Sequence, residues 1–67
     1  MFKNLLIEMM REDITKRMIA QELEKSYETI KSRFKGKTQW KENEMFKIRD
    51  KFFPDMTIEY LFEKTTT

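Results

Sequence analysis

The sequence predicts an all-α fold, and three features support this prediction. Helix-forming residues dominate the 67 positions, valine is absent, and glycine and proline occur once each. Glycine and proline are the strongest local breaks of regular structure, so a chain with one of each has few forced interruptions. The chain also lacks the long alternating runs and the Asn-Gly or Asp-Gly turns that are typical of β-hairpins. We therefore expect a single domain, residues 1–67, of four or five short helices.

The first half of the chain carries signals for three helices. Residues 2–11 have apolar side chains at helical spacing, namely Phe2, Leu5, Leu6 and Met9. Thr15 is a favourable N-cap for a second helix over 16–23. Ser26 is a favourable N-cap for a third helix, which is expected to run to about Phe34.

A fourth helix is expected over 42–52. Trp40 and Met45 fit a hydrophobic staple around an N-cap at position 41. Glu44 lies where a capping box requires an acid, because its side chain can reach back to the backbone of the capping residue. Pro54 then stops the helix.

The last block is more apolar than the cap of a small globule needs. The C-terminal helices are predicted over 42–63, with Thr57 as the N-cap of the last one and a frayed tail at 64–67. Some of the apolar side chains in this block must close the core, and it remains open whether all of them do. The others would remain exposed as an apolar patch, and the candidates for it are Phe53, Tyr60 and Phe62.

Residues 15–35 have the spacing of a helix-turn-helix. Two helices of similar length are joined by a short turn, and Gly36 closes the second helix because glycine adopts a left-handed C-cap without steric cost. Ala20 lies where the two helices would cross, and its small side chain permits close approach. Ile30 would fill the junction from the other helix. In such a unit the second helix can lie in the major groove of DNA.

These segments resemble the Cro/repressor (Xre-type) helix-turn-helix family. The resemblance lies in ITKRMIAQEL (14–23), SYETI (26–30) and KGK (35–37), while IRDKFFPD (48–55) and YLF (60–62) are similar to short Cro-like regulators of temperate phages from Gram-positive hosts. It covers nearly the whole chain. It implies a compact five-helix, lambda-repressor-like domain that binds a palindromic operator in double-stranded DNA as a dimer and regulates transcription. It also implies that the last block forms the interface of this homodimer, with Phe53, Tyr60 and Phe62 as the candidate residues.

The chain departs from the family pattern at two positions. The family usually has glycine at the turn, where this chain has Glu24, so a side chain must be accommodated in a left-handed or adjusted conformation at a cost of about 1 kcal/mol. The family often has glutamine at the start of the helix before the turn, where this chain has Lys16. Lysine keeps the charge for a phosphate contact but lacks the acceptor of glutamine.

The excess positive charge is confined to one segment. The net charge is only +2, yet residues 31–41 carry five basic side chains and no acid. Such a strip favours an anionic partner. It also fits an ordinary helix end, because lysine and arginine favour helix C-termini.

The candidate DNA contacts follow from the face of the third helix opposite Ile30 and Phe34. The candidates for reading base edges are Tyr27, Glu28, Lys31 and Ser32. The candidates for phosphate contacts are Lys16, Lys35, Lys37, Thr38, Gln39 and Lys41. Arg33 is expected to point sideways, toward a phosphate or an acid.

Other classes of function have little support in the sequence. Histidine and cysteine are absent, and no glycine-rich phosphate loop is present, so we expect neither an enzyme nor a metal or cofactor site, and no small-molecule ligand. No apolar run approaches the roughly 20 residues of a membrane span, so a cytoplasmic chain is expected. The alternative to DNA binding is a helix-turn-helix that docks on a protein, such as a phage inhibitor or antirepressor that acts on a host protein.

Overall fold

A computed structural model describes residues 2–64 and contains five helices. They are α1 Lys3–Arg11, α2 Lys16–Leu23, α3 Tyr27–Lys35, α4 Glu42–Phe52 and α5 Ile58–Leu61. Within 2–64 the chain has no strand, which confirms the predicted all-α class. The boundaries differ from the prediction at three helix ends, since Phe2 is the N-cap of α1, α3 runs on to Lys35, and Phe62 is the C-cap of α5. The predicted fraying of residues 65–67 lies outside the described residues.

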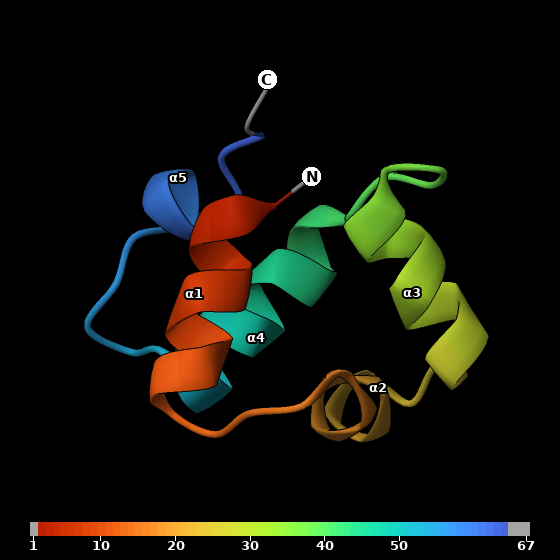
Figure 1. The fold of residues 1–67 in the computed structure, drawn as a ribbon, viewed down its shortest axis with the longest axis horizontal. Helices are drawn as coiled ribbons and strands as arrows, with labels where there is room; N and C mark the ends of the chain where they lie inside the picture. The colour runs from red at the N-terminus through yellow and green to blue at the C-terminus, as the bar shows by residue number, and fades with distance from the viewer. Residues whose placement is uncertain (1, 65–67) are drawn as a thin grey trace.

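The helices surround one core in a single compact body. Figure 1 shows α3 at one side of the molecule and α1 with α5 at the other, with α4 between them and α2 below. The helix contacts pair α2 with α3 and α4, and pair α5 with α1 and α4. The outer side of α3 is therefore left uncovered by the other helices.

Each helix contributes one fully buried aliphatic side chain to the core. These side chains are Leu5, Ile19, Ile30, Ile48 and Leu61. Aromatic rings pack beside these side chains. The Trp40 ring lies edge to face on Phe34 and on Phe62, with 5.2 Å and 5.4 Å between the ring centroids. Trp40 is buried, as expected for a staple residue, so burial of apolar surface fixes the end of the loop that leads into α4.

Side-chain caps define the starts of three helices as the sequence predicted. Thr15, Ser26 and Thr57 each accept a hydrogen bond from the backbone N–H three residues later, at 3.1 Å in every case. At α4 the side chain inside the helix satisfies the backbone of the capping residue. Glu44 Oε1 accepts a hydrogen bond from the backbone N–H of Lys41 at 3.0 Å. These local hydrogen bonds explain why the helix starts were predictable.

Candidate nucleic-acid interface

The turn between α2 and α3 is held in the conformation that the sequence predicted to be strained. Glu24 adopts a left-handed backbone conformation with φ of 56°, which costs a residue with a Cβ about 1 kcal/mol. The backbone N–H of Lys25 donates to the carbonyl oxygen of Ala20 at 2.9 Å and closes the end of α2. Ala20 and Ile30 are both buried in the core cluster. The two side chains that the spacing indicated are thus part of the core, and α2 packs against α3.

The outer face of α3 carries the four candidate base-reading side chains. Tyr27, Lys31 and Ser32 are half-buried and Glu28 is exposed. Lys31 Nζ lies 3.5 Å from Glu28 Oε2, and the Lys31 and Glu28 side chains remain 35% and 80% exposed. Lys31 Nζ also lies 5.4 Å from the centre of the Tyr27 ring. Three of the four candidates therefore form one cluster over the first turn and a half of α3.

Arg17 joins this cluster, and the sequence reasoning did not select it. Its guanidinium carbon lies 4.3 Å from the centre of the Tyr27 ring, on which the guanidinium stacks. Arg17 comes from the first turn of α2, whereas Tyr27 begins α3. The signal that points to it is the helix-turn-helix spacing, which brings the start of α2 beside α3. A second cation thus borders the aromatic side chain of the candidate reading face.

The phosphate candidates are divided between the start of α2 and the loop after α3. Lys16 is half-buried, with Nζ 5.1 Å from the centre of the Phe34 ring. The other candidates are all exposed, namely Lys35 at the end of α3 and Lys37, Thr38, Gln39 and Lys41 in the loop that follows it. Two hydrogen bonds tie this loop to α3, because the backbone N–H groups of Lys37 and Thr38 both donate to the carbonyl oxygen of Ser32, at 3.0 and 3.5 Å. The loop is therefore attached to the helix whose flank it extends.

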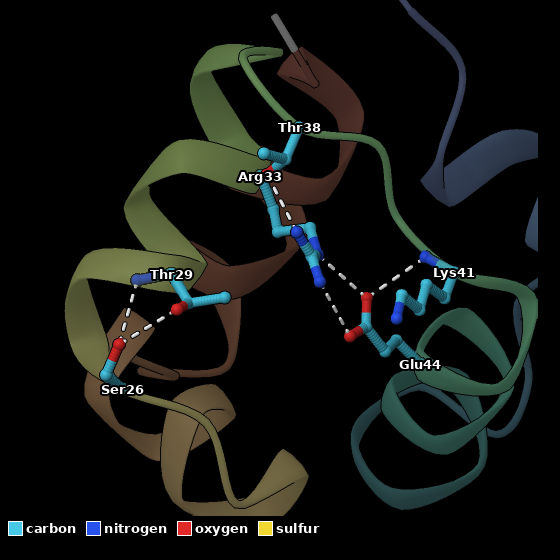
Figure 2. Close-up of polar contacts among 6 residues, drawn as sticks. All are labelled: Ser26, Thr29, Arg33, Thr38, Lys41 and Glu44. Atoms are coloured by element: carbon cyan, nitrogen blue, oxygen red, sulfur yellow. Dashed lines mark hydrogen bonds and ion pairs between the residues drawn. The ribbon is translucent and has the colours of Figure 1, made fainter.

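A buried ion pair joins α3 to α4 beneath this loop (Figure 2). Arg33 donates to both carboxylate oxygens of Glu44, from Nε at 2.9 Å and from Nη2 at 3.1 Å. Its Nη1 donates to the hydroxyl oxygen of Thr38 at 2.7 Å. The expectation that Arg33 points sideways and meets an acid is confirmed. Thr38 is exposed, but its hydroxyl accepts this hydrogen bond from Arg33. The ion pair therefore positions this phosphate candidate.

The surroundings of the ion pair shift the pKa values of both groups. Burial raises the pKa of Glu44, but the hydrogen bonds from Arg33 and from the Lys41 N–H outweigh it, so the pKa of Glu44 lies below its ordinary value. The hydrogen bond to Glu44 raises the pKa of Arg33. Both groups are charged near neutral pH, and each satisfies the other inside the protein.

The candidate dimer residues do not form the exposed patch that the sequence predicted. Phe53 is only 2% exposed and belongs to the core cluster, so its selection as a dimer contact is wrong. Phe53 is the C-cap of α4, and its N–H donates to the Arg49 carbonyl oxygen at 2.9 Å at the helix end. Its own carbonyl oxygen accepts from the Met56 N–H at 3.0 Å in the turn that follows, and the ring lies inside. Phe62 is half-buried and packs on Trp40.

Tyr60 is the one candidate of the three that remains exposed. Its hydroxyl donates to Glu8 Oε2 at 2.7 Å, which ties α5 to α1. This hydrogen bond raises the pKa of Tyr60. The side chain therefore has an intramolecular partner at its polar end.

Comparisons with known proteins do not place the chain in a family. No family model, no curated protein and no solved structure matches it. None of the helices within residues 2–64 has the length and apolar character that crossing a bilayer requires.

Proposed function

We propose that this chain is a sequence-specific DNA-binding transcriptional regulator, lambda-repressor-like in the arrangement of its helices. In this proposal α3 enters the major groove, and two copies occupy paired half-sites roughly one helical turn apart in a palindromic operator. The chain acts in the cytoplasm and without enzymatic activity, by occupying promoter DNA. The observation that carries the proposal is the uncovered outer face of α3, on which Tyr27 and Lys31 lie together, bordered by Arg17.

The charges around this face support the proposal. Cations border α3 on two sides, with Lys16 and Arg17 from the start of α2 and the lysines of residues 35–41 at and beyond the C-terminal end of α3. Phosphate contacts from both sides would hold the helix in register, while the side chains between them reach base edges. The N-terminus of α2 also carries the positive end of the helix dipole, which favours a phosphate.

Glu28 has a defined place in this interface. An exposed carboxylate near phosphates is unfavourable unless it accepts a hydrogen bond, and the cytosine N4 amino group is a suitable donor in the major groove. The neighbouring Lys31 partly offsets the negative charge at 3.5 Å. We therefore assign Glu28 to cytosine and Lys31 to guanine or an adjacent phosphate.

The decisive experiment is selection of bound sites from a random pool of duplex DNA, followed by affinity measurements on the selected site. We expect a palindrome. Tyr27→Ala and Lys31→Ala should each relax the preference at one or two base pairs, with losses on the selected site of about 5- to 150-fold. Lys51→Ala is the matched control, because Lys51 lies in the last turn of α4 and is not a candidate DNA contact. Its affinity should stay within a factor of about 2 of wild type.

The second candidate function is docking on a protein through the same face. Two exposed acidic side chains favour it, because they would repel DNA phosphates. The Glu28 side chain is 80% exposed in the centre of the face, and Glu24 is exposed at the turn. A gel shift with random duplex DNA at low salt separates the two functions. A DNA-binding protein shows at least weak non-specific binding under these conditions, and its absence would leave the protein-docking function as the better one.

A further inference from the structure

A groove between α4 and α5 lies outside the proposed DNA interface. It has a volume of about 390 Å³, and Phe46 and Ile58 line it together with the charged side chains of Glu42, Arg49 and Glu59. Phe46 is 43% exposed, so its ring lies at the surface and not in the core. A cavity of about 150 Å³ accommodates benzene, so the groove has room for an incoming phenylalanine ring. It therefore has an apolar centre and a charged rim, as protein interfaces do.

The groove is complementary to itself. Glu42, Phe46 and Arg49 are spaced i, i+4 and i+7 and share one face of α4. If two α4 helices pack antiparallel across a two-fold axis at Phe46, position 49 of one copy faces position 43 of the other, next to Glu42. A two-fold interface needs this property, because the same patch must meet itself.

The charges on the rim match this pairing. The Arg49 guanidinium carbon lies 5.8 Å from the centre of the Phe46 ring, and Nε donates to Asp50 Oδ1 at 2.7 Å. That hydrogen bond uses only Nε, so the outer end of the guanidinium remains for a carboxylate of the second copy. Glu42 and Glu59, which also line the groove, supply such carboxylates.

We infer that a second copy of this chain docks in the α4–α5 groove, with the two Phe46 rings at the two-fold axis and Arg49 paired with Glu42 across it. The choice of a second copy rests on the proposed function, which places two copies on paired half-sites. None of the groove residues is a candidate DNA contact, so the dimer leaves the outer face of α3 free. This surface replaces the one predicted around Phe53, which is buried.

The small area that this groove can bury predicts that the dimer is weak. A stable interface buries about 800 Å² on each partner, which is about one sixth of the 4787 Å² surface of this chain. A single helix–helix groove offers less than that, so we expect dissociation in the micromolar range and above, with the operator holding the two copies together.

Sedimentation equilibrium of the full chain without DNA tests the inference, from about 10 μM to about 1 mM protein. We expect a reversible monomer–dimer equilibrium for the wild type. Phe46→Glu should weaken it by about tenfold or more, because it buries a charge at the axis. Met10→Glu is the matched control: Met10 is 79% exposed on α1, outside the groove, and its substitution should leave the equilibrium unchanged. Circular dichroism melting verifies that both variants fold.

Charge reversal tests the pairing across the axis. Arg49→Glu should weaken association, and adding Glu42→Arg to the same chain should restore it, because the opposite charges then meet again between copies. The inference is overturned if the wild type stays monomeric up to the highest concentration, if Phe46→Glu associates like the wild type, or if the double variant is no better than Arg49→Glu.

Binding to a DNA duplex with a single half-site separates this inference from the proposed function. Phe46→Glu should bind the half-site as tightly as the wild type, since α3 is untouched. If the wild type binds the half-site but never dimerises, the groove assignment fails and the proposed function stands. If it dimerises through Phe46 but binds no DNA, the proposed function fails and the groove assignment stands.

Discussion

The Glu44 carboxylate accepts three hydrogen bonds while it is almost completely removed from water. Two come from the Arg33 guanidinium and one from the backbone N–H of Lys41. Removing a charge from water costs several kcal/mol, and only good geometry with both oxygens satisfied compensates for it. The pair therefore contributes to stability only as long as both partners are present and charged.

We expect Glu44→Gln to lower the free energy of unfolding at neutral pH by about 3 kcal/mol, because it leaves the Arg33 charge buried without a counter-ion. The pKa of Glu44 is lowered in the folded protein from an ordinary value of 4.5. The stabilisation by the carboxylate is therefore fully present above that value and is lost as the pH falls through the lower folded pKa.

Urea unfolding from pH 7 to pH 2.5 measures this effect. The stability difference between wild type and Glu44→Gln should be constant near neutral pH and shrink at the acid end. Glu63→Gln is the control, because Glu63 is exposed and should show a difference within about 0.5 kcal/mol at every pH. A wild-type advantage that persists unchanged at pH 2.5 would contradict the role given to the carboxylate.

At the scale of the elements, this chain stores local strain in the connections that follow α1 and α2. Glu24 has φ of 56°, and Asp13, just after the C-cap of α1, has φ of 57°. Both positions follow a helix, where a left-handed residue allows the chain to reverse direction. Glycine would adopt this conformation without the clash of a Cβ.

We expect Glu24→Gly to raise the free energy of unfolding by about 0.5–1 kcal/mol, because it removes the left-handed strain at the cost of some added freedom in the unfolded chain. Lys25→Gly is the matched control one residue later, where φ is not positive. It should gain nothing and lose a few tenths of a kcal/mol. Thermal melting compares them, and equal gains at both positions would show that the strain at Glu24 is not the cause.

The sequence predicted the elements well because their ends are set locally. The caps at Thr15, Ser26 and Thr57 each involve residues three positions apart, and such signals are readable from spacing alone. Packing between distant elements was not readable. Tyr60 meets Glu8 across 52 positions, and no local pattern indicates that contact.

The same distinction holds for the candidate site. The outer face of α3 followed from helical periodicity, so Tyr27, Lys31 and Glu28 were found together. The stacking of Arg17 on Tyr27 depends on how α2 crosses α3, and the burial of Phe53 depends on how the chain turns after α4. The sequence gives the number of apolar side chains that could form an interface. Which of them are exposed depends on how the helices pack.

At the scale of the whole molecule, the distribution of cations predicts how DNA binding responds to salt. Four lysines are phosphate candidates, namely Lys16, Lys35, Lys37 and Lys41. Counter-ion release then gives a slope of log K against log salt of about −3 to −4 for each protomer. A flat response would contradict phosphate binding by these side chains.

Lys37→Ala should weaken binding to all sequences alike and reduce this slope by about 1, because it removes one phosphate contact without touching the bases. Fluorescence anisotropy on the selected site and on a scrambled duplex, each over a series of salt concentrations, measures both effects. Lys51→Ala should leave the slope unchanged. A loss of base preference in Lys37→Ala would move this residue from the phosphates to the reading face.

Trp40 is the single tryptophan of the chain, and its ring touches Phe2 at the N-terminal end, Phe34 in α3 and Phe62 after α5. The indole is thus a native fluorophore at the point where Phe2 and Phe62 meet the helix-turn-helix. Loss of the tertiary structure exposes the indole to water and shifts its emission to longer wavelength, without any added label. Because Gln39 and Lys41 flank Trp40 in the sequence, we expect a ligand that binds this loop to change the quantum yield of the indole, so that the same emission reports on both unfolding and binding.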